Sequence, residues 1–122
     1  LLIGTNNLGQ SDSLDKIIRE YKIIIDKITS YAPGADLYIQ SILPINSDKF
    51  MFPRPEYNNK KIKNLNFMIK NLEDNRVSYL HLFDHFVDKK GKLDEKYSND
   101  GLHLNGLGYQ KWKEILINKN IL

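Results

Sequence analysis

Apolar residues recur along this chain in two rhythms, which predict strands and helices in turn. Three short apolar runs are typical of buried strands, at residues 1–4, 37–43 and 77–83. Elsewhere apolar residues return every three or four positions, which predicts amphipathic helices between Ser13 and Pro33, over 58–74 and over 105–118. Residues 45–57 and 84–103 show no clear period, and we expect them to be loops.

The alternation of strands and helices predicts an α/β fold. Strands that alternate with helices in this order form a parallel sheet with helices on both of its faces. A length of 122 residues allows one domain at most. Three strands make a thin sheet, and the free edge of the first strand needs cover. Because the chain begins inside a predicted strand, we expect it to be part of a longer polypeptide.

Composition excludes several classes of function. The net charge of +3 comes from 18 basic and 15 acidic residues spread over the whole chain, so no nucleic-acid patch is expected. The absence of cysteine excludes a disulfide scaffold, a thiol nucleophile and a Cys-ligated metal. No apolar run is long enough to span a membrane. The sequence does not determine the compartment, and a secreted or periplasmic location is the expectation.

Two polar motifs contain residue types that are common in catalytic sites: one follows the first predicted strand, and the other precedes the last predicted helix. Asn6 comes just after the first strand, where its amide N–H could stabilise an oxyanion or merely shape a turn. Asp100 and His103 stand three residues apart before the last helix. Their side chains could form an Asp–His pair of a hydrolytic triad, or a surface His beside a capping Asp.

Together the two motifs resemble blocks of the SGNH (GDSL-type) hydrolases: Gly-x-Asn, here Gly4-Thr5-Asn6, and Asp-x-x-His, here within Asp100-Gly-Leu-His-Leu-Asn-x-x-Gly-Tyr109. The resemblance implies a three-layer α/β/α, flavodoxin-like fold with strand order 2-1-3-4-5. This chain would supply the last three strands, as the C-terminal part (residues 1–122) of a single SGNH domain. The Gly-Asp-Ser nucleophile block and the block with the oxyanion glycine are not in the chain, so an N-terminal segment would have to supply them.

The resemblance also implies a function. His103 would act as base and then acid, Asp100 would orient it, and Asn6 would contribute to the oxyanion hole of a serine ester hydrolase. No metal and no cofactor are implied. The first expectation for the substrate is a small acyl group, such as acetyl, on a carbohydrate. The alternatives are a lysophospholipase or thioesterase, and a non-catalytic glycan- or partner-binding module. The chain alone is expected to be inactive.

A few other residues carry weaker expectations. Arg54, between two prolines, could reach the substrate or could be a solvated loop residue. Where the family most often has an Asp after the oxyanion Asn, this chain has Asn7. The carboxylate that usually braces this loop is therefore missing, and the sequence does not show what replaces it. Either Asn64 or Asn66 falls where the family often has a structural Asn. His81 and His85 match no metal-binding motif, and we expect no metal site.

Overall fold

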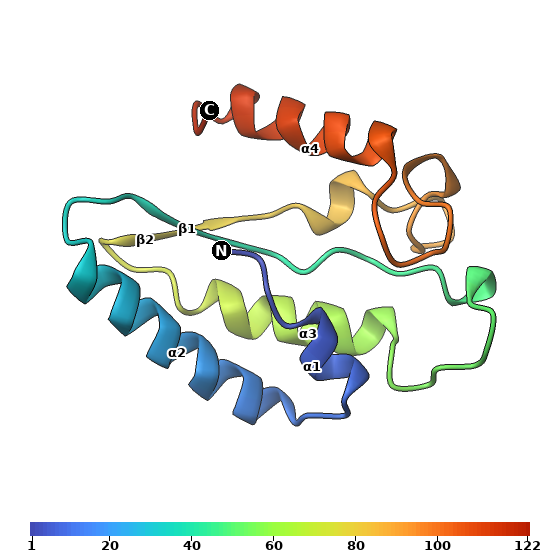
Figure 1. Ribbon diagram of the computed structural model, residues 1–122, viewed down its shortest axis with the longest axis horizontal. Coiled ribbons are helices and arrows are strands. Elements are labelled where there is room, and N and C mark those ends of the chain that lie inside the picture. Colours follow the sequence, from blue (N-terminus) through green and yellow to red (C-terminus); the bar gives the residue numbers. More distant parts are fainter.

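The computed structural model describes all residues, 1–122, as a layered α/β arrangement (Figure 1). Strands β1 (Leu37–Gln40) and β2 (Val77–Leu80) pair in parallel, with Leu37 opposite Val77. Helices α2 (Leu14–Tyr31) and α3 (Asn59–Lys70) cover one face of this sheet, and α4 (Gly106–Asn118) covers the other. The expected three-layer α/β/α fold with a parallel sheet is therefore confirmed.

The first predicted strand is wrong in its extent, although its position beside β1 is as expected. Only Leu1 pairs with β1: its ammonium group donates to the Tyr38 carbonyl at 2.6 Å, and its carbonyl accepts from Gln40 N at 2.8 Å. Gly4, with φ of 106°, then turns the chain into the short helix α1 (Thr5–Gly9). Pairing through one residue is too short to form a regular strand, so the sheet has two strands rather than three.

The other two strands are shorter than their apolar runs. The hydroxyl of Ser41 accepts hydrogen bonds from Leu82 N at 2.8 Å and Phe83 N at 2.9 Å. These bonds draw the chain after Leu80 away from the ladder and into a 3₁₀ helix at Phe83–His85. The backbone after β2 thus bonds to the Ser41 side chain, and the backbone after β1 bonds to the Asn66 side chain at Ile42.

Each long helix begins at a capping side chain, which explains why their starts were predictable. Ser13 accepts from Lys16 N, Asn58 from Lys61 N, and Asn105 from Gly108 N. Helix α3 ends at Lys70, earlier than the expected residue 74. There the carboxylate of Asp74 accepts from the backbone of Arg76 and Val77 and shapes a turn into β2.

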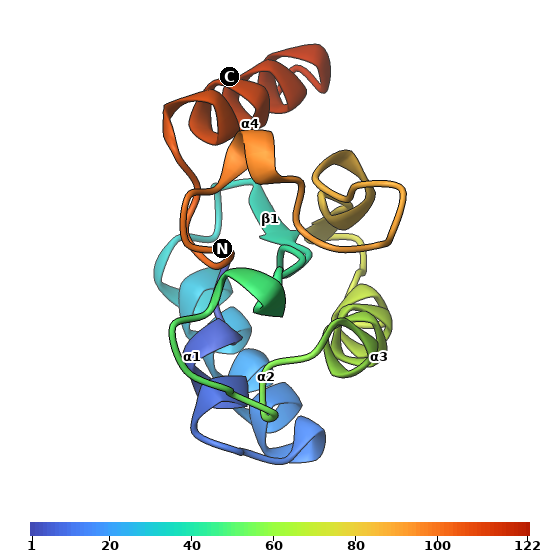
Figure 2. The ribbon, with the colours of Figure 1, turned by 90° about the vertical axis from the view of Figure 1, so that its right-hand side faces the viewer.

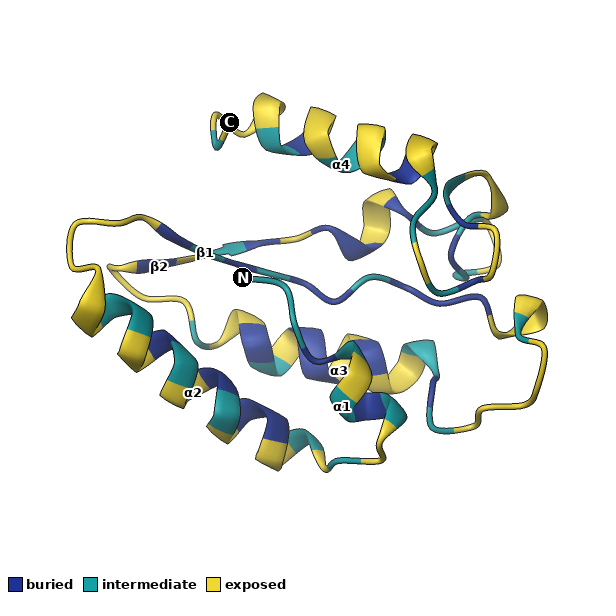
Figure 3. Ribbon diagram, viewed as in Figure 1, coloured by how far each residue is buried: buried dark blue, intermediate teal, exposed yellow.

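The core lies in two layers, one on each side of the sheet (Figure 3). The larger layer lies between the sheet and helices α2 and α3, and includes Ile17, Tyr21, Ile39, Ile42, Leu65 and Ile69. The smaller lies under α4 and consists of Leu80, Leu82, Phe86, Leu93 and Ile115. No helix combines the length and the apolar character needed to cross a membrane.

Candidate active site

The Asp100 and His103 side chains form a close pair in the turn before α4. Asp100 Oδ2 lies 2.7 Å from His103 Nδ1. The other carboxylate oxygen, Oδ1, accepts from the backbone N–H of Leu102 at 2.9 Å and of His103 at 2.8 Å. One carboxylate therefore holds both the backbone turn and the imidazole ring, and Nε2 remains available for a reacting group.

The electrostatics of this pair suit a general base. The hydrogen bond from the His103 ring, with backbone N–H bonds from His103 and Leu102, holds the pKa of Asp100 well below its usual range. The carboxylate thus stays ionised and favours the imidazolium that forms when His103 takes a proton. The His103 side chain is 78% exposed, so a substrate or a nucleophile can reach its ring.

The turn that carries the pair is built by Ser98 and Gly101. Ser98 Oγ accepts from Gly101 N at 2.9 Å and lies 3.3 Å from Asp100 Oδ1. Gly101 has φ of 81°, and its carbonyl accepts from Asn46 N at 2.8 Å. The turn that carries Asp100 and His103 is therefore hydrogen-bonded to the segment that follows β1.

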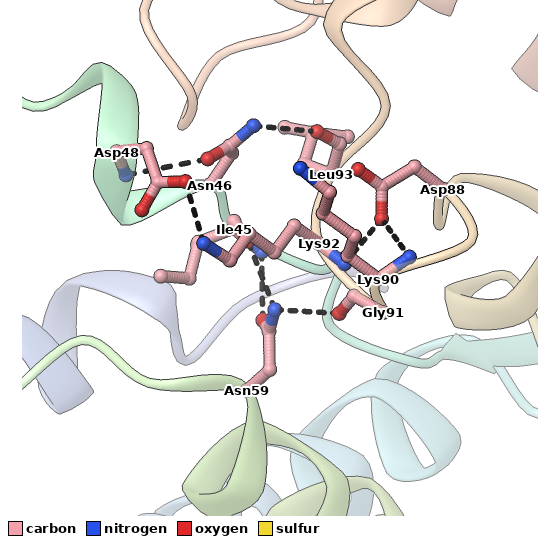
Figure 4. A network of polar contacts seen from close by, with 9 residues as sticks. All are labelled: Ile45, Asn46, Asp48, Asn59, Asp88, Lys90, Gly91, Lys92 and Leu93. Atoms are coloured by element: carbon pink, nitrogen blue, oxygen red, sulfur yellow. Dashed lines mark hydrogen bonds and ion pairs between the residues drawn. The ribbon is translucent and has the colours of Figure 1, made fainter.

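That segment is itself held by side-chain amides, shown in Figure 4. The amide of Asn59 donates to the carbonyls of Ile45 and Gly91, both at 2.9 Å, and accepts from Ile45 N at 2.8 Å. Asn46 Nδ2 donates to the Leu93 carbonyl at 3.3 Å. The two regions predicted to be loops are thus joined to α3 and to each other by a polar network that no sequence period reveals.

Another side-chain amide bonds to the backbone next to β1, and it shows which of Asn64 and Asn66 is the structural asparagine. Asn66 is buried, donates to the Ile42 carbonyl at 2.8 Å and accepts from Ile42 N at 2.7 Å. Asn64 is exposed on the outer face of α3. The structural asparagine of this helix is therefore Asn66, which holds the chain in place as it leaves β1.

Asn6 lies within α1 rather than in a turn, which corrects the expected local structure, and its side chain is exposed. In Figures 1 and 2, α1 and the loop before α4 both lie at the carboxyl end of the sheet. Asn7 donates to the carboxylates of Asp12 at 3.0 Å and Glu20 at 3.1 Å. The position where the family has an acid is thus braced here by an amide that bridges two acids.

Arg54 lies in the same surface depression as the Asp100–His103 pair, a space of about 450 Å³. The loop from Lys49 to Arg54 forms one side of this depression, and Asn99 to His103 form the other. The structure thus brings three of the four predicted site residues together. Asn6 does not line this depression and belongs to a neighbouring part of the same edge.

Sequence reasoning missed a second His–Asp pair. His81 Nε2 lies 2.9 Å from Asp84 Oδ2, and both line a depression of about 520 Å³ between β2 and α3. The three-residue spacing, the same as in the Asp100–His103 pair, was the signal available in the sequence. This larger depression contains none of the predicted site residues. No three His, Asp or Glu side chains converge as a metal site would require.

Comparison with known proteins places this geometry in a family. A family model described as GDSL-like Lipase/Acylhydrolase matches residues 1–111. No curated protein matches the chain. A solved structure from Streptococcus pneumonia, described as a proposed platelet activating factor, is 30% identical, with a TM-score of 0.91. The alignment covers 98% of this chain and 57% of that one.

Two more distant structures share the fold. A proposed acylhydrolase from Bacteroides fragilis is 19% identical with a TM-score of 0.78, covering 99% of this chain and 62% of that one. A GDSL-like lipase from Bacteroides thetaiotaomicron is 23% identical with a TM-score of 0.76, covering 98% and 60%. The chain therefore spans about three fifths of the length of these structures. Because the family model matches residues 1–111, the chain belongs to the GDSL-like lipase/acylhydrolase family of hydrolases.

Proposed function

We propose that the chain is the C-terminal part of a serine ester hydrolase domain in which His103 is the catalytic base. The observation that carries the proposal is the 2.7 Å contact between Asp100 Oδ2 and His103 Nδ1, which leaves Nε2 of an exposed ring free. In this proposal a preceding segment supplies the nucleophilic Ser and a second oxyanion donor. We refer to the chain with that segment as the complete domain.

The roles follow from acyl-transfer chemistry. His103 Nε2 takes the proton of the Ser hydroxyl as its oxygen attacks the ester carbonyl, and Asp100 stabilises the resulting imidazolium. The Asn6 amide donates to the oxyanion of the tetrahedral intermediate. His103 then gives its proton to the departing alcohol, which leaves an acyl-serine. Water, deprotonated by His103, hydrolyses this intermediate and restores the Ser.

For the substrate we propose a small acyl group, such as acetyl, on a carbohydrate. The polar side chains of Lys49, Arg54 and Asn99 in the depression beside His103 support an alcohol with several hydroxyl groups. A second candidate is lysophospholipase or thioesterase activity. It is supported by the exposed Met51 and Phe52 in the same depression and by the platelet activating factor named in the description of the streptococcal structure. A non-catalytic binding module is the remaining candidate, and it requires that the preceding segment lack the Ser.

Hydrolysis of an aryl acetate tests the proposal. The complete domain should hydrolyse it, whereas residues 1–122 alone should not exceed the buffer rate. His103→Ala should lower the rate about 10²- to 10⁴-fold, the usual contribution of a general base. Asp100→Ala should cost less than His103→Ala, since it leaves the base in place.

His81→Ala is the matched control, because His81 also contacts an Asp three residues away but lies in the other depression. Its rate should equal that of the parent domain. Turnover by residues 1–122 alone, or an active His103→Ala domain, would show that other residues carry the reaction.

A further inference from the structure

The depression beside His103 is on the side of the site where the departing alcohol must lie. During acyl transfer the imidazole donates its proton to the alcohol oxygen, whereas the oxyanion donor contacts the carbonyl oxygen. His103 lines the depression of about 450 Å³ and Asn6 does not. Side chains of this depression therefore contact the alcohol portion of the ester, a step that rests on the function proposed above.

The wall of this depression combines an apolar surface with a defined shape. Met51 is 87% exposed and Phe52 is 69% exposed. Their loop is anchored at both ends: Phe50 packs edge-on against Tyr57 with ring centroids 6.0 Å apart, and Tyr57 N donates to the Arg54 carbonyl at 3.1 Å. The flat ring of Phe52 offers an apolar face against which one face of a sugar ring can pack.

The charged side chains of the depression indicate whether the alcohol portion of the substrate is itself charged. Lys49 is compensated by Glu95 at 3.3 Å, and the Asp100 carboxylate is occupied by the His103 ring and by backbone N–H groups. No carboxylate lies within ion-pair distance of Arg54. Arg54 is thus the cation of this depression that has no ion-pair partner, and the fork of donors on its guanidinium suits a carboxylate.

We propose that the substrate is an O-acylated acidic sugar, with its carboxylate bound by Arg54 and one ring face against Phe52. The carboxylate forms a charge-assisted pair with the guanidinium while the acylated hydroxyl lies at His103. Arg54 is then a specificity-determining residue that acts on binding of the alcohol portion rather than on the chemical step.

Two matched substrates test this in the complete domain: methyl glucuronide and methyl glucoside, each acetylated at the same hydroxyl. At low ionic strength the glucuronide should have about tenfold higher kcat/KM, about 1.4 kcal/mol, and added salt should reduce this preference. Arg54→Gln should abolish the preference by raising KM for the glucuronide, with kcat unchanged. Arg76→Gln, an exposed arginine outside the depression, is the control and should change nothing.

A binding measurement keeps the proposal separate from the function on which it rests. Unacetylated methyl glucuronide should perturb the NMR signals of Arg54 and Phe52, and methyl glucoside should do so more weakly. His103-dependent hydrolysis of an aryl acetate tests the esterase alone. Equal handling of the two sugar esters, equal binding of the two sugars, or an Arg54-dependent preference found only with a lysophospholipid would each overturn the acidic-sugar proposal.

Discussion

Replacing Gly101 by alanine should loosen the turn that carries Asp100 and His103. A Cβ at this position would collide with the Asn46 carbonyl oxygen and lie 3.1 Å from the carbonyl carbon. Both contacts are with backbone atoms, which cannot rotate out of the way as a side chain could. The turn must therefore move away from the segment after β1.

The expected cost can be built from two contributions. A φ of 81° places the new alanine in the left-handed region, at about 1–2 kcal/mol. Separation of the two segments breaks the 2.8 Å hydrogen bond from Asn46 N to the Gly101 carbonyl and leaves buried polar groups unpaired, at about 1–3 kcal/mol. We expect Gly101→Ala to lower the free energy of unfolding by about 3 kcal/mol in total.

Two other glycines separate these contributions. Gly91 also has a positive φ, 74°, but nothing lies within 4 Å of its Cβ position, so Gly91→Ala should cost only about 1 kcal/mol. Gly106 opens α4 with neither feature, so Gly106→Ala should be neutral or stabilising. Urea unfolding of the complete domain, followed by circular dichroism, measures all three variants, and an aryl acetate assay reports on the pair.

The three variants should also differ in a definite order of stability. Gly101→Ala should be the least stable of the three variants and should also lose activity, because the His103 ring moves with the turn. A Gly101→Ala variant as stable as Gly91→Ala would refute the argument from the close backbone approach.

Three further outcomes are expected. The pKa of Asp100 is held low, chiefly by the His103 ring, so this carboxylate stabilises the fold at pH values above the usual Asp pKa of about 4. That stabilisation is lost as the pH falls toward the lowered pKa, and Asp100→Asn should flatten this part of a curve of unfolding free energy against pH. Asn66→Ala should cost about 2–3 kcal/mol in urea unfolding because it leaves buried backbone groups unpaired, whereas the exposed Asn64→Ala should be neutral. Residues 1–122 alone should be molten, aggregated or self-paired, since α4 exposes Leu107 and Tyr109 and the sheet edge at Leu1 is open; a monomeric, cooperative transition by near-UV spectroscopy and sedimentation would contradict this.

The sequence by itself determined the elements with long, regular patterns. The three long helices begin where the apolar period places them, each directly after a capping side chain, Ser13, Asn58 or Asn105. Capping is a local hydrogen bond between residues three apart, so it can be read from neighbouring letters. The Asp100–His103 contact was predictable for the same reason, because both side chains lie on one turn.

Only the tertiary structure decided what depends on partners distant in the chain. The apolar run at residues 1–4 has the composition of a strand, yet Leu1 alone meets β1, and the helix α1 begins at Thr5. The placement of Arg54 and His103 in one depression depends on the Asn59 and Asn46 networks, which connect segments separated by tens of residues. Such contacts leave no period in the sequence, because they are set by where the sheet directs each loop rather than by the spacing of residues along it.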